Sequence, residues 1–265
     1  MGRVPGGTFG AVAFHVYRPT APSGTVFVVH GLFDHAGLWG HYLRWGLARN
    51  LAMVLVDLPG HGLSDGPRVH VDDFADYVSS LRAVADTLDD LPRPRVGLGH
   101  STGCAALMEA VHGDALLLDD LWLLAPLIRA GAHRAGRWLL PALSLVRRHL
   151  PRGDYGNTLD PAFNAFRNAD PLQPPTLPLS WLRAMRRWSD AFVDRPRHAL
   201  SPLMVQGDRD RTVAWRENRV HLARVFTEPD IRLVEGAGHN LMNERADLRA
   251  QVEGLFDARL GAFGG

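Results

Sequence analysis

A serine between two glycines is the part of this sequence with the clearest capacity for chemistry. Residues 99–103 read Gly-His-Ser-Thr-Gly, after the apolar run 96–98 and before the helix-forming stretch 104–111. This pattern is typical of a nucleophile elbow, a sharp strand-to-helix turn that exposes the serine and needs small neighbours so that adjacent backbone can pass close by. Because a serine hydroxyl attacks only after a base accepts its proton, Ser101 predicts a histidine and a carboxylate elsewhere in the chain.

Two later segments supply candidates for the base and the acid, each directly after a predicted strand. Asp208 and Asp210 follow the strand predicted at 202–206, and the spacing Gly-x-x-Asp before a β-branched pair favours Asp210 as the acid and Asp208 as a turn residue. His239 lies in a glycine-flanked loop after the next predicted strand. We therefore predict a catalytic triad of Ser101, Asp210 and His239. The alternative is that His239 is a hydrogen-bonded loop residue and both aspartates are solvated.

The negative charge that develops on a carbonyl oxygen during acyl transfer needs hydrogen-bond donors, and backbone amides usually supply them. One candidate is the amide of Thr102, immediately after the serine. The other is the amide of Leu32, in the loop His30-Gly31-Leu32-Phe33 that follows a predicted strand. The His30-Gly31 pair also fits a tight turn at a strand end, and the two interpretations are compatible.

Short apolar runs alternate with amphipathic segments along most of the chain, a pattern that predicts parallel strands joined by crossover helices. Strands are predicted at 10–17, 25–30, 52–57, 95–99, 121–125, 202–206 and 231–235. Helices are predicted at 38–50, 71–91, 102–112, 215–226 and 244–260. The expected fold is α/β, with a mostly parallel central sheet flanked by helices and with 1–127 and 201–265 as its core.

The alternation stops for about 75 residues after the strand at 121–125, far more than a crossover requires, which predicts a helical cap over the active site at 128–200. The cap is rich in basic residues, namely Arg129, Arg134, Arg137, Arg147, Arg148 and Arg152. It is interpreted either as a mobile lid that makes transient contact with a membrane surface or as a helical layer that packs on the core. Pro141 interrupts the helical pattern and favours the second interpretation.

Three aromatic residues of the cap are spaced for overlapping faces of one helix: Trp181, Trp188 and Phe192. Together with Phe33 and Leu127, they are the candidate lining of a substrate pocket. An ordinary packed cap explains the three aromatic residues equally well.

Composition excludes several other classes of protein. With 46% hydrophobic residues in 265, the chain can bury a large core, and a formal net charge of +1 predicts no nucleic-acid partner. The absence of lysine excludes Schiff-base chemistry and an ordinary P-loop. A single cysteine, no signal-peptide pattern at residues 1–10 and no apolar stretch near the roughly 18 residues that span a bilayer predict a cytoplasmic protein. The sequence predicts no particular oligomeric state.

With these residues in place, the chain resembles the α/β-hydrolase superfamily. Within it, the chain is most similar to the monoacylglycerol lipase and lysophospholipase branch, also grouped as serine aminopeptidase (S33-like) hydrolases. The resemblance is carried by the elbow and by residues 28–35, 57–66, 168–172, 207–210 and 238–239. It implies a helical cap inserted after the sixth strand, and hydrolysis of carboxylic esters through an acyl-serine intermediate without a metal or an organic cofactor. The substrate that it favours is a single-chain lipid ester, monoacylglycerol or lysophospholipid-like.

One position departs from the branch, which commonly has another glycine where this chain has Cys104. Cys104 itself is not expected to be the nucleophile, because it lies on the predicted helix rather than at the exposed turn. Two alternatives to a lipid esterase stay open: a carboxylesterase, thioesterase or amidase that acts on a small non-lipid substrate, and a non-catalytic ligand receptor on the same fold. His35, His61 and His100, near the expected mouth of the site, are predicted to be structural.

Overall fold

The central element of the computed structural model, which describes residues 1–131, 147–152 and 158–263, is an eight-stranded sheet. Its strands lie in the order β1 (Gly2–Pro5), β2 (Ala11–Tyr17), β4 (Ala52–Val56), β3 (Thr25–Val29), β5 (Arg95–His100), β6 (Asp120–Leu124), β9 (Leu203–Gly207) and β10 (Asp230–Val234). The pairs β1 with β2 and β2 with β4 are antiparallel, and the other neighbouring pairs are parallel. The structure therefore confirms the predicted mostly parallel sheet.

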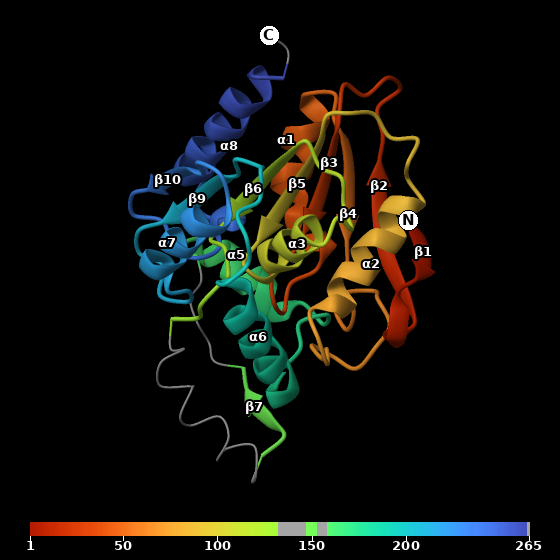
Figure 1. Ribbon diagram of the computed structural model, residues 1–265, viewed down its shortest axis with the longest axis vertical. Coiled ribbons are helices and arrows are strands. Elements are labelled where there is room, and N and C mark those ends of the chain that lie inside the picture. Colours follow the sequence, from red (N-terminus) through yellow and green to blue (C-terminus); the bar gives the residue numbers. More distant parts are fainter. Residues whose placement is uncertain (132–146, 153–157, 264–265) are drawn as a thin grey trace.

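Helices cover both faces of the sheet (Figure 1). One face packs against α1 (Gly40–Ala48) and α8 (Ala246–Gly261), and the other against α2 (Ala75–Asp86), α3 (Thr102–His112) and α7 (Trp215–Val225). Neighbouring residues of a strand point to opposite faces, so Met53 of β4 joins the α1 side whereas Val54 joins the α2 side. Burial on both faces explains why the strands are continuous apolar runs. None of the helices in the described part of the chain is long and apolar enough to cross a membrane.

The helix predicted at 71–91 differs most from the structure, which confines it to Ala75–Asp86. Val71 and Phe74 are fully buried, as the apolar pattern predicts, but they lie before the helix. There the Asp73 side chain accepts a hydrogen bond from the amide of Ala75. An aspartate that bonds to nearby backbone competes with helical hydrogen bonds and favours a helix start. The apolar pattern therefore extends beyond the helix itself.

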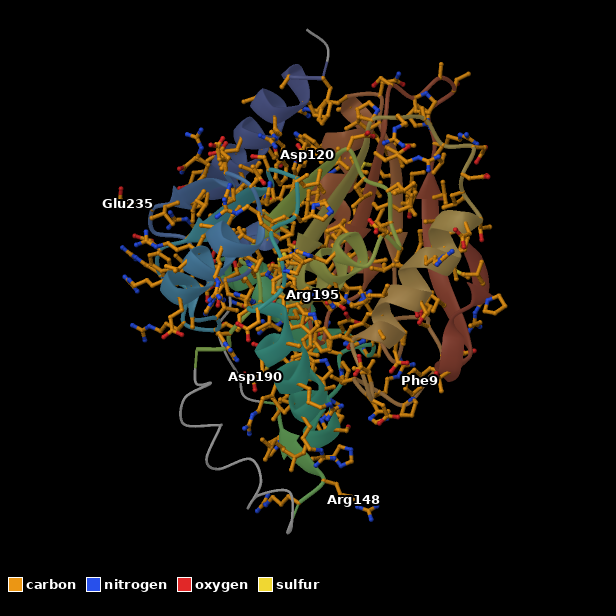
Figure 2. All side chains as sticks on the ribbon, in the orientation of Figure 1. Phe9, Asp120, Arg148, Asp190, Arg195 and Glu235 are labelled. Carbon is orange, nitrogen blue, oxygen red and sulfur yellow. The ribbon has the colours of Figure 1, made fainter. Side chains whose placement is uncertain are left out.

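Between β6 and β9, residues 147–152 and 158–200 form what we call the cap segment, which includes the lower end of the molecule in Figure 1. It contains a two-stranded antiparallel sheet of β7 (His149–Pro151) and β8 (Thr176–Pro178), and the helices α5 (Pro161–Ala169) and α6 (Leu179–Phe192). The insertion follows the sixth strand, as the resemblance implies, although the sequence patterns predict only five strands before it because β1 is missing from them. Figure 2 shows Arg148 at the tip of the cap segment and Asp120 toward the opposite end of the molecule. Arg134, Arg137 and Pro141 lie outside the described residues.

Three single turns of 3₁₀ helix complete the described elements: η1 (Gly7–Phe9), η2 (Ala36–Trp39) and η3 (Leu241–Asn243). Two of them matter for the site. η2 follows the loop after β3, and η3 follows the loop after β10 that carries His239. Both loops begin at the carboxyl ends of parallel strands, the edge of an α/β sheet where functional groups gather.

Candidate active site

Ser101 lies in the sharp turn between β5 and α3. Its φ of 51° and ψ of −110° place it in a backbone region that non-glycine residues rarely adopt. A Cβ at Gly103 would lie 2.1 Å from the carbonyl oxygen of Val29, and a Cβ at Gly99 would lie 2.7 Å from the amide nitrogen of Cys104. The two glycines therefore permit the close backbone approaches that the strained turn requires, as the elbow pattern predicts.

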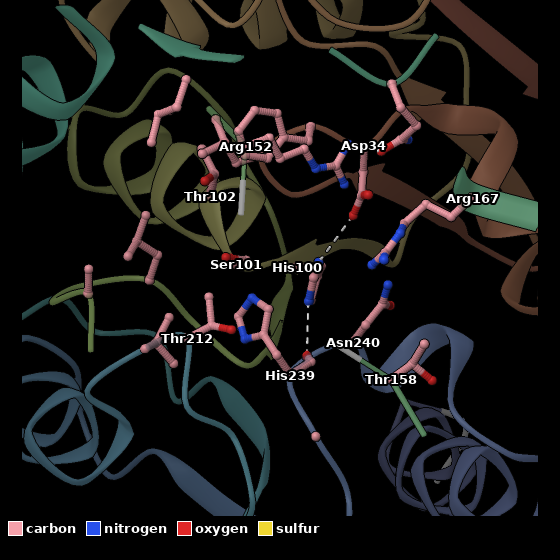
Figure 3. A pocket seen from close by; sticks show the side chains of 18 of the residues that line it. Asp34, His100, Ser101, Thr102, Arg152, Thr158, Arg167, Thr212, His239 and Asn240 are labelled. Atoms are coloured by element: carbon pink, nitrogen blue, oxygen red, sulfur yellow. Dashed lines mark hydrogen bonds and ion pairs between the residues drawn. The ribbon is translucent and has the colours of Figure 1, made fainter. Parts of the chain in front are cut away.

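The Asp210 carboxylate and the His239 ring, which the sequence places in different loops, are hydrogen-bonded to each other in the structure. His239 Nδ1 donates to Asp210 Oδ2 at 2.8 Å, and both residues are buried. With the proton on Nδ1, the other ring nitrogen, Nε2, is free to accept a proton. Ser101 and His239 line the same pocket, and Figure 3 shows them side by side there.

Asp210 is held as a carboxylate by its surroundings. Burial of the carboxyl acts to raise its pKa, but the neighbouring His239 ring and hydrogen bonds from Gln206 Nε2 and the Thr212 amide outweigh this effect and hold the pKa below its usual value. Asp208, the other candidate acid, instead accepts a hydrogen bond from the amide of Gly236 at 2.7 Å. The structure therefore brings Asp210, and not Asp208, to the histidine.

The loop after β3 passes directly beside the serine. A Cβ at Gly31 would lie 2.7 Å from His100 Nδ1 and 3.3 Å from the Cβ of Ser101, so only glycine permits this approach. Leu32 and Thr102, whose amides are the predicted oxyanion donors, line the pocket together with Ser101. Both residues therefore border the same cavity as the nucleophile, and their role as oxyanion donors stays a prediction.

His100 has a role that the sequence analysis assigns only as structural. Its Nε2 donates to the backbone carbonyl of His239 at 3.0 Å, and its Nδ1 lies 3.7 Å from Asp34 Oδ2. The Asp34 carboxyl is also buried, which acts to raise its pKa, but His100 and the nearby Arg152 guanidinium hold that pKa below its usual value. The residue before the nucleophile thus anchors the loop that carries the histidine, and its position inside the elbow is the signal that could have predicted this contact.

The cavity above Ser101 has a volume of about 1130 Å³ and is lined by apolar and by polar side chains, which we call its apolar side and its polar side. Its apolar side is formed by Leu127, Leu177, Trp181, Leu182, Met185 and Val213. Its polar side, much of which Figure 3 shows, is formed by Asp34, His100, Arg152, Thr158, Arg167 and Asn240. Phe33, Leu127 and Trp181 are thus placed in the lining, as the sequence predicts. Leu182 and Met185, one and four residues after Trp181, are lining residues that the sequence analysis missed.

The other two predicted aromatic residues of α6, Trp188 and Phe192, are not among the residues that line this cavity, which fits the alternative of an ordinary packed cap. Trp188 stacks on Phe74 with ring centroids 5.0 Å apart and donates from Nε1 to Glu109, and it also stacks on Phe192. Trp188 thus packs on the residue that precedes α2 and bonds to α3, and Phe192 packs on His112 of α3. The physical reason is the helical rise of about 1.5 Å per residue, which carries Trp188 roughly 10 Å beyond Trp181 although both lie on one face.

A histidine and aspartate pair, with His35 buried and Asp170 partly buried, joins the cap segment to the loop after β3. His35 Nε2 donates to Asp170 Oδ2 at 2.6 Å, while His35 Nδ1 accepts from the amide of Gly37. Desolvation acts to raise the pKa of Asp170, but the hydrogen bond from His35 and one from the amide of Leu172 hold that pKa below its usual value. Asp170 belongs to the Asp-Pro-Leu part of the resemblance, and His35 is structural as predicted, with the cap as its partner.

Comparisons with known proteins agree with this arrangement. A family model described as serine aminopeptidase, S33 matches residues 20–246. The chain is 29% identical over 246 residues to a monoacylglycerol lipase of Mycolicibacterium smegmatis, which covers 88% of this chain and 87% of that one. It is 26% identical over 252 residues to the monoglyceride lipase of Homo sapiens, with coverage of 89% and 82%. A solved structure of Paleococcus ferrophilus monoacylglycerol lipase matches with a TM-score of 0.75 and 19% identity, covering 92% of this chain and 98% of that chain.

Because the sequence identity to the solved structure is low, that similarity shows only that the fold is shared. The match to the family model shows that the chain is related to the family. That model extends from before β3 to the start of α8, and so includes the elbow, both loops and the cap segment. Because it covers well over half of the sequence, the chain belongs to the serine aminopeptidase S33 family of α/β-hydrolases and is a hydrolase, as the motifs predict.

Proposed function

We propose that this protein hydrolyses carboxylic esters of single-chain lipids through an acyl intermediate on Ser101. The observation that supports this most directly is the 2.8 Å hydrogen bond between His239 Nδ1 and Asp210 Oδ2, made by a ring that lines the same pocket as Ser101. That bond fixes the tautomer whose Nε2 accepts a proton, which is what a serine nucleophile needs.

In the first half of the proposed reaction, His239 Nε2 accepts the proton of Ser101 Oγ as Oγ bonds to the ester carbonyl carbon. The carbonyl oxygen becomes an oxyanion, to which the amides of Leu32 and Thr102 donate. Protonated His239, stabilised by the Asp210 carboxylate, then gives its proton to the departing alkoxide. The alcohol leaves, and the acyl group stays on Ser101.

In the second half, a water molecule gives a proton to His239 as its oxygen bonds to the acyl carbon. The resulting tetrahedral species uses the same two amide donors. Its collapse breaks the bond to Ser101 Oγ, which recovers the proton from His239, and releases the fatty acid. No group other than water is consumed.

The chemistry of the pocket supports a lipid ester as substrate. The apolar lining residues give an acyl chain a hydrophobic surface, and the polar ones give hydrogen-bonding groups to an alcohol leaving group. Because the similar protein of Mycolicibacterium smegmatis is named a monoacylglycerol lipase, we propose a monoacylglycerol or a lysophospholipid-like ester. Residues 128–200 are proposed as the cap that completes the apolar side.

A fluorophosphonate probe tests the nucleophile. We expect the probe to label the wild-type protein and not Ser101→Ala, with both proteins showing the same circular dichroism spectrum. A folded wild-type protein that does not react would overturn the proposal and favour a ligand receptor on the same fold.

A chain-length series of p-nitrophenyl esters, measured beside monoacylglycerol, tests the substrate class. We expect kcat/KM to rise from acetate toward long acyl chains. Rates that peak at acetate and vanish beyond butyrate would exclude a lipid substrate. Faster turnover of a matched thioester or amide would indicate a thioesterase or an amidase instead.

A further inference from the structure

We propose that Glu244 is a positioning residue that couples the cap segment to the loop carrying His239. This inference rests on the proposed function, because it concerns the placement of the base in that reaction. Glu244 follows η3, five residues after His239, and it is completely buried. It contacts neither Ser101 nor the ring of His239 in any hydrogen bond of the described residues, so it would act through the backbone.

The Glu244 carboxylate joins two segments that are far apart in the sequence. Its Oε1 accepts from the amide of Gly238 at 2.8 Å, and Gly238 immediately precedes His239. Its Oε2 accepts from the amide of Leu159 at 2.9 Å and lies 3.2 Å from Thr158 Oγ1. One rigid group thus links the histidine loop of the core to the start of the described cap residues at 158.

A second contact strengthens the link on the cap side. Thr158 Oγ1 donates to the backbone carbonyl of Asn243 at 2.7 Å, and Thr158 itself lines the pocket. On the other side of the histidine, the carbonyl of His239 accepts from His100 Nε2. The backbone of His239 is therefore held from both directions, by Glu244 before it and by His100 after it.

This arrangement makes the position of the His239 ring depend on where the cap segment lies. A shift of residues 158–159 would move the Glu244 carboxylate, the Gly238 peptide and then the ring relative to Ser101. Proton transfer is sensitive to such shifts, because displacement of a catalytic group by about 1 Å can lower a rate by roughly 100-fold. A carboxylate serves this linkage because it has two acceptor oxygens and no donor, which matches two amide N–H groups.

Replacement by glutamine is the sharpest test, because it keeps the volume and removes one acceptor. In either orientation of the side-chain amide that Glu244→Gln introduces, its NH₂ group would face a backbone N–H, so one of the two links must break. The matched control is Asp120→Asn. Asp120 is also a buried carboxylate that bonds to two parts of the chain, Trp122 and Arg259, but it lies at the amino end of β6, away from the pocket.

The measurements are kcat and KM for a p-nitrophenyl ester, the rate of fluorophosphonate labelling and the thermal midpoint. For Glu244→Gln we expect kcat and the labelling rate to fall roughly 10- to 100-fold while KM changes less than about threefold. Asp120→Asn should lower the thermal midpoint while kcat per folded molecule stays at the wild-type value. Thr158→Val, which removes only the hydroxyl on the cap side, should lower kcat in the same direction by a smaller factor.

Wild-type kcat in both Glu244→Gln and Thr158→Val would overturn the inference, as would an equal fall in kcat in Asp120→Asn. If Glu244→Gln does not fold, Thr158→Val decides the question by its fluorophosphonate labelling rate, because labelling expels fluoride and involves no alcohol leaving group that Thr158 could bind. Failure of the proposed function has a different signature, since the wild-type protein would then neither react with the probe nor hydrolyse the ester. In that case the inference falls together with the function on which it rests.

Discussion

The core side and the cap side of the pocket are specified by the sequence in different ways. On the core side, Ser101, Asp210 and His239 each follow a parallel strand, so the sheet brings them to one edge whatever the intervening residues are. On the cap side, the lining depends on how α6 lies across the core. Trp181 and Trp188 have equivalent positions on the helix face, yet only Trp181 lines the pocket. The comparison suggests that chemistry is set by the core and chain-length preference by the cap.

The largest effect should come from the core side. Replacing Asp210 by asparagine should lower kcat by about 10⁴-fold, because an amide favours the wrong histidine tautomer and does not stabilise the charged ring. Asp208→Asn should keep kcat within a few fold of wild type, since Asp208 bonds only to the Gly236 amide in the described contacts. Steady-state rates on one p-nitrophenyl ester compare the two variants. Equal losses would show that the acid is misassigned.

The elbow glycine should give the next largest effect. In Gly103→Ala the new Cβ would lie 2.1 Å from the backbone oxygen of Val29 and 2.6 Å from that of His30, and neither oxygen can move without moving β3. We expect kcat to fall by about 100-fold and unfolding free energy by about 3 kcal/mol. The control is Gly254→Ala on the exposed face of α8, where a Cβ meets no atom within 4 Å and should stabilise by about 0.5 kcal/mol. Activity and urea unfolding measure both effects, and an unchanged kcat in Gly103→Ala would argue against a tight elbow.

The two tryptophans of α6 are both buried in the core, but they differ in whether they line this cavity, so only one of them should alter the chain-length profile. Trp181→Ala should shift the preferred acyl chain to a longer one, because Trp181 lines the cavity. It should also lower the unfolding free energy, because the buried indole packs on Phe74 and donates from Nε1 to the Tyr77 hydroxyl. Trp188→Ala should lower the unfolding free energy by about 3–5 kcal/mol and leave the chain-length profile unchanged, because its ring stacks between Phe74 and Phe192. A p-nitrophenyl ester series and chemical denaturation test this pair. A shifted chain-length profile in Trp188→Ala would indicate that the Trp188 ring lines the pocket.

The smallest effect should come from the contact between cap and core at His35 and Asp170. Because the folded pKa of Asp170 lies below its unfolded value, this carboxylate stabilises the fold at pH values above the unfolded pKa, and the contribution is lost as the pH falls through the lower folded pKa. Asp170→Asn should therefore lower the thermal midpoint at pH 7. Below about pH 4, the midpoint of this variant should fall less steeply with decreasing pH than that of the wild type. The exposed carboxylate Asp86, paired with Arg82, gives the control Asp86→Asn. Parallel pH profiles for wild type and Asp170→Asn would contradict the expectation.

Much of the core could be predicted because its signals are local. The bounds of α3, Thr102–His112, match the prediction to the residue, since the elbow fixes where the helix begins. The strands that were predicted from the apolar runs are also present in the structure. β1 was beyond prediction, because Gly2–Pro5 is a short edge strand that contains glycine and proline and has an alternating exposure with no fully buried residue. Val71 and Phe74 show the opposite error. They are buried although they lie outside the helix, so the apolar pattern predicts a helix that is too long.

The contacts that complete the site could not be predicted because they join distant segments. Asp170 meets His35, and Glu244 meets Leu159, only after the cap segment packs on the core. The spacing of these four residues in the sequence does not indicate which of them will be in contact. His100 is different, since its place between Gly99 and Ser101 fixes it at the carboxyl end of β5 and hence near any histidine loop. The sequence could have predicted that it contacts the loop, although not that it bonds to the backbone of His239.

Cys104, which directly follows the elbow, can serve as a probe of local opening. The thiol is completely buried, burial raises its pKa well above the ordinary value, and its Sγ donates to the carbonyl of Leu124 in β6. A disulfide reagent can reach it only when α3 separates from the sheet. Because this is the single cysteine in the chain, the rate of thiol modification under native conditions reports how often the turn that holds Ser101 opens.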